Sequence, residues 1–204
     1  IAAVRASIRL FERMKQQERK IPQGKLAVNS TSAHSLLPAL HNRHIKLINA
    51  TWEEMIKYMD VHGVRIIDRC LTKKPDLIRL LPKLAACKKC KSCRSLRNNA
   101  ASIQYGRKLL LDITSVVINL RNNAILESYI RDTFHRLREA GVDKEDIEMC
   151  RDELIMYLAD IQPSKWSTEA KSAWKTMVDA ITTLGTKGWQ HPSDGLSIRK
   201  TVSS

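Results

Sequence analysis

Apolar side chains recur every three or four residues along most of the chain, which is the spacing of one face of an α-helix. Strand-like alternation is nearly absent. After Pro38 the pattern predicts helices over about residues 38–59, 61–72, 100–120, 124–138, 143–160 and 168–184. A short segment, Asp76–Leu84, follows Pro75. The pattern therefore predicts an all-α fold around one core.

Individual residues predict where one helix ends and the next begins. Gly141 is expected to end a helix, because glycine readily takes the left-handed conformation found there. Asp143 is expected to cap the next helix. Glu145 and Asp146 would then lie in its first turn, where the helix dipole favours negative charge.

The chain is expected to have three parts: a helix and linker over 1–35, a helical domain over 36–189 and a flexible tail over 190–204. Residues 1–20 form a basic amphipathic pattern, and we keep two interpretations of it. The extra helix packs on the main domain, or it binds a membrane surface or a partner. Its apolar positions are Val4, Ile8, Phe11 and Met14.

The charge of the chain favours anionic partners. Lys and Arg number 35 and Asp and Glu 21, for a net charge of +14. Such a balance suits nucleic acid, an acidic membrane surface or an acidic protein. No apolar run approaches the about 18 residues of a membrane helix. We therefore expect a soluble cytoplasmic protein, or one attached to a membrane through sequence before Ile1.

Five cysteines fall into two groups. Cys70 and Cys150 lie within apolar helical patterns, where cysteine packs as a small hydrophobe. Cys87, Cys90 and Cys93 lie among Lys and Arg residues. Three hypotheses remain for that loop: free exposed thiols, a redox-active or disulfide-forming loop, and a zinc site, for which a second Cys-x-x-Cys pair is missing.

Over about residues 40–189, the order of the predicted helices and the positions of the glycines and prolines between them resemble those of a globin. Trp52 lies in the first helix of the domain, and His62-Gly63 follows ten residues later. Pro75 opens the next segment, and Leu81 stands at its corner. In globins the second helix crosses the distal helix too closely for a side chain, which explains a glycine at position 63.

The second half of the chain carries the resemblance further. Gln104-Tyr105-Gly106-Arg107 resembles the distal segment, and Leu126 to Gly141-Val142 resembles the proximal one. Trp174 and Gly188-Trp189 fit the last helix and its end. The resemblance implies a globin fold of about eight helices around a haem-type pocket, with an extra N-terminal helix.

A globin also implies haem b, whose iron is held by a neutral proximal imidazole. His135 is the only histidine between residues 63 and 190, so it is the candidate ligand. The family's histidine lies four residues before the Gly-Val pair, where Leu137 stands here. Two residues correspond to about 200° around a helix. Leu81 replaces the corner Phe that stacks on haem, which removes about 1 kcal/mol of ring stacking.

The resemblance implies a pocket lined by Ile67, Leu81, Gln104, Tyr105, Leu109, Leu137, Val142 and Ile147. The distal segment has no histidine, and Ile103, Gln104 or Tyr105 stands in its place. A Tyr hydroxyl or Gln amide there would donate a hydrogen bond to bound oxygen. The other interpretation is that Tyr105 points to solvent and the pocket is apolar.

Two hypotheses of function follow. The first is a haem globin, not an enzyme apart from redox chemistry at the haem, that binds oxygen or another diatomic gas reversibly. Sensing or one-electron transfer is then favoured over storage, with an acidic redox or signalling protein, or a second copy of the chain, as partner. The second is a haem-free globin-fold interaction module for an acidic protein, a membrane surface or nucleic acid. Nucleic acid is not expected under the first hypothesis.

Overall fold

The computed structural model describes residues 40–86 and 96–189. These residues form α2 (Asn42–Lys57), α3 (Met59–Lys73), the 3-10 helix η1 (Pro75–Leu80), α4 (Pro82–Ala85), α6 (Ala100–Ile118), α7 (Asn123–Glu139), α8 (Lys144–Ile161) and α9 (Thr168–Gly185). The prediction of an all-α fold is confirmed. The helix expected within residues 1–20 and the cysteines of the basic loop lie outside the described residues.

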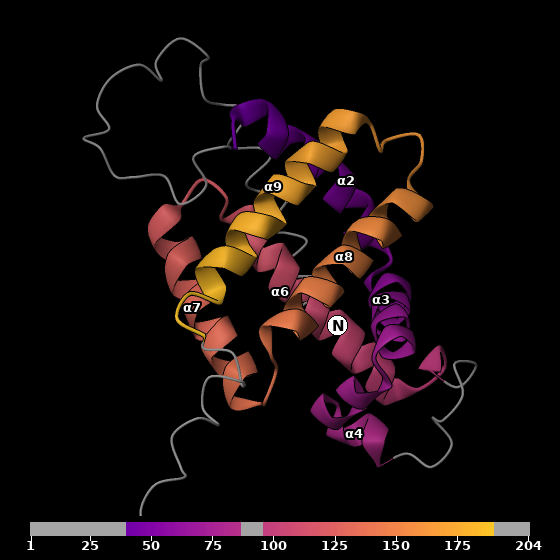
Figure 1. The fold of residues 1–204 in the computed structure, drawn as a ribbon. Coiled ribbons are helices and arrows are strands. Elements are labelled where there is room, and N and C mark those ends of the chain that lie inside the picture. The colour runs from indigo at the N-terminus through magenta and orange to yellow at the C-terminus, as the bar shows by residue number, and fades with distance from the viewer. Residues whose placement is uncertain (1–39, 87–95, 190–204) are drawn as a thin grey trace, which may run out of the picture.

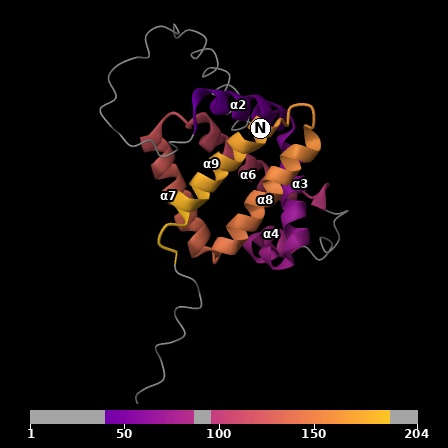
Figure 2. The same ribbon diagram turned by 45° about the horizontal axis from the view of Figure 1, so that its top comes forward.

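The helices pack in crossed pairs around one main core (Figures 1 and 2). One end of this arrangement is built on α3, which packs against α6 and α8. The other is built on α9, which packs against α2, α7 and α8 and runs between α7 and α8 in both views. Helix α6, which resembles the distal segment, packs mainly on α3, and α7, which resembles the proximal segment, packs mainly on α9.

The closest contact between helices is the crossing of α3 and α6. A Cβ atom added to Gly63 would lie 2.3 Å from the carbonyl carbon of Gly106, and one added to Gly106 would lie 2.6 Å from that of Gly63. The two backbones therefore touch, with no room for a side chain on either. The role predicted for Gly63 is confirmed, and its partner is Gly106.

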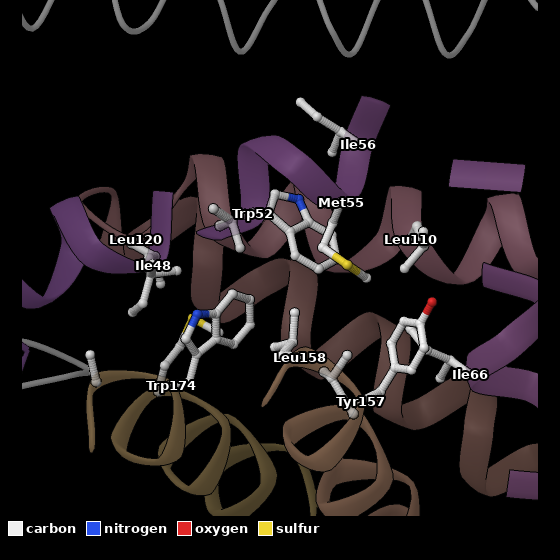
Figure 3. Close-up of a cluster of buried hydrophobic side chains, with 14 of the residues drawn as sticks. Ile48, Trp52, Met55, Ile56, Ile66, Leu110, Leu120, Tyr157, Leu158 and Trp174 are labelled. Carbon is white, nitrogen blue, oxygen red and sulfur yellow. The ribbon is translucent and has the colours of Figure 1, made fainter. Parts of the chain in front are cut away.

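Two tryptophans fill the centre of the core, and each indole N–H has an acceptor. Trp52 donates to Thr114 Oγ1 at 3.0 Å, and Trp174 donates to Thr51 Oγ1 at 2.6 Å. Both rings are fully buried, with centroids 5.7 Å apart (Figure 3). A buried N–H without an acceptor costs free energy, so these bonds favour one packing of α2, α6 and α9.

Local signals explain where the helices begin and end. Gly141 has a φ of 81°, and the Asp143 side chain accepts from the backbone N–H of Asp146 at 2.7 Å. The segment expected over Asp76–Leu84 is divided into η1 and α4. Leu81 stands between them with φ −121° and ψ 67°, because a residue before proline, here Pro82, avoids the helical conformation.

Within the described residues, no helix combines the length and the apolar character needed to cross a membrane.

Replacing Gly63 with alanine should destabilise the fold by at least about 2 kcal/mol, because the new methyl group meets rigid backbone that no rotamer change relieves. Urea unfolding followed by circular dichroism measures this change. Lys108→Ala, on the exposed face of α6, is the matched control and should stay within about 0.5 kcal/mol of the parent. Equal stabilities for Gly63→Ala and the parent would contradict the close crossing.

Candidate functional site

The rotation of α7 about its axis decides which of its side chains reach the interior. Its buried residues are Leu126, Ile130 and Phe134, one helical turn apart. The Phe134 ring occupies the space beside Gly185, where an added Cβ would lie 2.3 Å from the ring. The ring of Trp189 lies 6.1 Å from that of Phe134, centroid to centroid. The start and the end of α7 are therefore both held by buried contacts.

His135 lies on the outer face of α7. Its side chain is 72% exposed, and its Nδ1 lies 3.4 Å from Oε2 of Glu139, which is itself 65% exposed. Bringing the imidazole to the position of Phe134 would require α7 to rotate by about 100°. That rotation would expose Phe134 and its buried neighbours, each of which contributes about 1.5–3 kcal/mol through burial.

Leu137 lies on the opposite side of α7 from His135 and is partly buried. On a helical wheel it falls about 60° from Phe134, on the side of Tyr129 and Thr133. The hydroxyl of Tyr129 donates to Oδ1 of Asp112 in α6 at 2.8 Å, so this side of α7 faces α6. Leu137 therefore stands between the contacts to α6 and those to α9.

The same hydrogen bond is a polar link between α6 and α7 that the sequence did not predict. Burial, together with the bond to Asp112, raises the pKa of Tyr129 to about 12. The tyrosine is therefore a neutral donor at ordinary pH, and α6 and α7 are joined by a hydrogen bond on the side that faces the interior.

The polar distal candidates are held by the short helix α4. Gln104 is exposed, and its Oε1 accepts from Lys83 Nζ at 3.1 Å. The Tyr105 hydroxyl accepts from the backbone N–H of Lys83 at 3.3 Å. Both groups are thus directed to α4, and neither of the two sequence interpretations of Tyr105 describes this placement.

The apolar candidates are divided between two clusters. Leu81 and Tyr105 pack with a small group under the short helices, formed by Val64, Leu84 and Leu96. Of the other apolar candidates, Leu109 and Ile147 are partly buried against the main core, and Ile67 and Val142 are buried. The structure therefore brings together Leu81 and Tyr105, and leaves His135 apart from all of these residues.

A row of polar contacts joins α3 to α8 and was not predicted from the sequence. Nδ1 of His62 lies 2.6 Å from the hydroxyl of Tyr157, whose ring is seen in Figure 3. Burial, and then the charge of Arg65, lowers the pKa of His62. Further along, Arg69 Nε donates to Oε2 of the buried Glu153 at 2.8 Å. These partners lie far apart in the sequence, so no local signal relates them.

Comparison with known proteins agrees with this arrangement of helices. The profile of the family described as Globin matches residues 64–183, more than half of the chain. This chain belongs to the globin family. Neuroglobin of Danio rerio is 23% identical over 143 residues, which cover 70% of this globin and 88% of the fish protein. Neuroglobin-1 of Oncorhynchus mykiss is 22% identical over 159 residues, which cover 76% and 98% of the two chains.

A solved structure shares the fold. It is that of a hexacoordinated heme protein from an anhydrobiotic tardigrade, with a TM-score of 0.65 and 16% identity. The match covers 74% of this globin and 96% of the tardigrade chain.

The side chains of this globin do not fit a haem held by His135. An axial imidazole must point between the distal and proximal helices, and His135 points to solvent beside Glu139. The other histidines among the described residues are remote from α7: His41 and His44 contact each other at the start of α2, and His62 contacts Tyr157 in α8. By the spacing expected from the family, the position of the proximal imidazole falls on Leu137, which is partly buried.

Leu137→His should create a haem site, because it places an imidazole on the inward side of α7. After addition of hemin and removal of the unbound fraction, this variant should show a Soret band that the parent lacks. His135→Ala introduced into Leu137→His should leave the band unchanged. Loss of the band in that double variant would show that His135 reaches the interior and would contradict its placement.

Proposed function

We propose that this globin is an interaction module that works without a histidine-held haem and binds an acidic partner. The observation that carries the proposal is the position of the only candidate imidazole of the proximal segment. His135 is exposed on α7, and Leu137 takes the inward position. A globin domain without a metal ligand still offers a stable helical body to which binding segments are attached.

Most of the net positive charge of the chain is carried by the segments 1–39, 87–95 and 190–204. The described residues contain 22 Lys and Arg against 18 Asp and Glu, whereas the remaining 63 residues contain 13 against 3. Many charges of the body are also paired, as in Arg107 with Asp60 at 2.5 Å and Arg43 with Glu169 at 2.5 Å. Attraction of an acidic partner is therefore assigned to the segments 1–39, 87–95 and 190–204. The parts expected from the sequence, 1–35, 36–189 and 190–204, stay a prediction.

The pattern of residues 1–20 favours an anionic membrane surface as the partner. Apolar residues at helical spacing, among them Ile8 and Phe11, alternate with Arg9, Arg13 and other basic residues. An amphipathic helix of this kind lies in the interface with its apolar side in the lipid, and its basic side attracts anionic headgroups. An acidic protein offers charge without the apolar layer, so it explains less of the pattern.

Gas binding through haem b is the second candidate. Membership of the globin family and the similarity to neuroglobins favour it. In that case an oxygen or redox sensor, or an electron-transfer partner of an acidic protein, would suit the basic extension better than a storage protein. The Leu137→His comparison separates the two candidates, since haem binding by the parent chain requires an imidazole that already points inward.

The membrane proposal predicts binding of the chain to vesicles of phosphatidylcholine and phosphatidylserine, and little binding to phosphatidylcholine alone. Co-sedimentation measures both. Arg9→Glu with Arg13→Glu should weaken binding to the anionic vesicles by at least about tenfold, because each basic residue near such a surface contributes about 1 kcal/mol. Added salt should weaken binding by the parent as well.

Lys108→Glu with Lys171→Glu is the matched control, since it reverses two exposed charges on the helical body. This variant should bind the anionic vesicles within about threefold of the parent. An equal loss in both double variants would assign binding to the body. Absence of binding to the anionic vesicles would overturn the membrane surface as partner.

A further inference from the structure

Helices α3 and α8 run antiparallel, and their polar contacts give the register between them. Arg69, one residue before Cys70, pairs with Glu153, three residues after Cys150. Lys74, four residues after Cys70, pairs with Asp146, four residues before Cys150. This register places Cys70 directly opposite Cys150. Neither cysteine has a role in the proposed function.

The two cysteines belong to the same part of the core. Cys70 is 8% exposed and belongs to the main cluster, and Cys150 is partly exposed and packs against the same cluster. Both are free thiols in this structure. Each thiol shifts the pKa of the other, as expected of neighbouring sulfur atoms. Facing cysteines on two packed helices are near the arrangement that a disulfide requires.

The surroundings make the two thiols unequal. The neighbouring thiol of Cys150, and then burial, raises the pKa of Cys70 well above its usual range. The neighbouring thiol of Cys70 lowers the pKa of Cys150, with a smaller contribution from the charge of Lys74, against the effects of burial, Asp146 and Glu153. Cys150 is therefore the thiol that ionises first, and it is also the more exposed.

We propose that Cys70 and Cys150 form a redox-sensitive thiol pair that a hydroperoxide oxidises to a disulfide linking α3 to α8. The Cys150 thiolate attacks one peroxide oxygen, the O–O bond breaks, and the sulfur becomes a sulfenic acid while the other oxygen leaves as hydroxide or alcohol. The Cys70 sulfur then attacks the sulfenic sulfur, an S–S bond forms and water leaves. Two thiols lose two electrons to the peroxide, and their protons end in the water or alcohol formed.

The pair acts independently of the membrane proposal, because it lies within the helical body. Its product closes the chain from Cys70 to Cys150 and fixes α3 against α8. Detection of the disulfide depends on sulfur chemistry alone, so absence of the cross-link would leave the vesicle-binding results unaffected.

The test uses the full chain with Cys87→Ser, Cys90→Ser and Cys93→Ser, so that only the two core cysteines remain. The protein is treated with hydrogen peroxide, alkylated with iodoacetamide and cleaved with trypsin without reduction. Mass spectrometry should detect a cross-linked species that joins residues 70–73 to residues 145–151, and reduction with dithiothreitol should abolish it. Recovery of both peptides as alkylated monomers, or linkage only between different chains, would overturn the proposal.

Two single variants test the assigned order of the steps. With Cys70→Ser, the sulfenic acid on Cys150 has no resolving thiol, so dimedone should label residues 145–151. With Cys150→Ser, Cys70 is buried and should stay unlabelled. The reverse labelling would overturn the order of attack. The cross-link in the cysteine-triple variant tests the disulfide itself, even if either single variant folds poorly.

Discussion

The contact of Gly63 with Gly106 sets the distance between α3 and α6, and much of the remaining structure depends on it. With the two backbones touching, α3 reaches α8 on its other side, and α6 reaches Trp52 through Thr114. Both the packing of α3 on α8 and the bond between Trp52 and Thr114 require neighbouring helices that are no more than about one side chain apart. A larger residue at either glycine would move α6 away from α2 and α3 together.

The same packing would hold the domain together without a metal ligand, as the proposed function requires. Its core is held by the paired tryptophans, by the ion pairs between α3 and α8, and by the burial of Phe134 against α9. None of these contacts involves His135. The bond between Tyr129 and Asp112 joins α6 to α7 directly, so these two helices do not depend on a shared cofactor to stay together.

Much of the fold could be predicted from the sequence because the signals are local. Helical spacing, the cap at Asp143 and the turn at Gly141 depend on neighbouring residues, and each agrees with the structure. The rotation of α7 could not be predicted in the same way. It depends on Phe134 meeting Gly185 and Trp189, which are about fifty residues away in the chain. The pairing of Cys70 with Cys150 likewise depends on the register of α3 and α8, which α4, α6 and α7 separate in the sequence.

The proposed function depends most on the exposed position of His135, which leaves the interior without an imidazole from α7. The visible absorption spectrum of the purified chain tests this position most directly, recorded with hemin in the ferric and dithionite-reduced states after unbound hemin is removed. We expect the same spectra for the parent and for His135→Ala, without the bands of a histidine-ligated haem. A strong Soret band in the parent that disappears in His135→Ala would contradict this placement of His135.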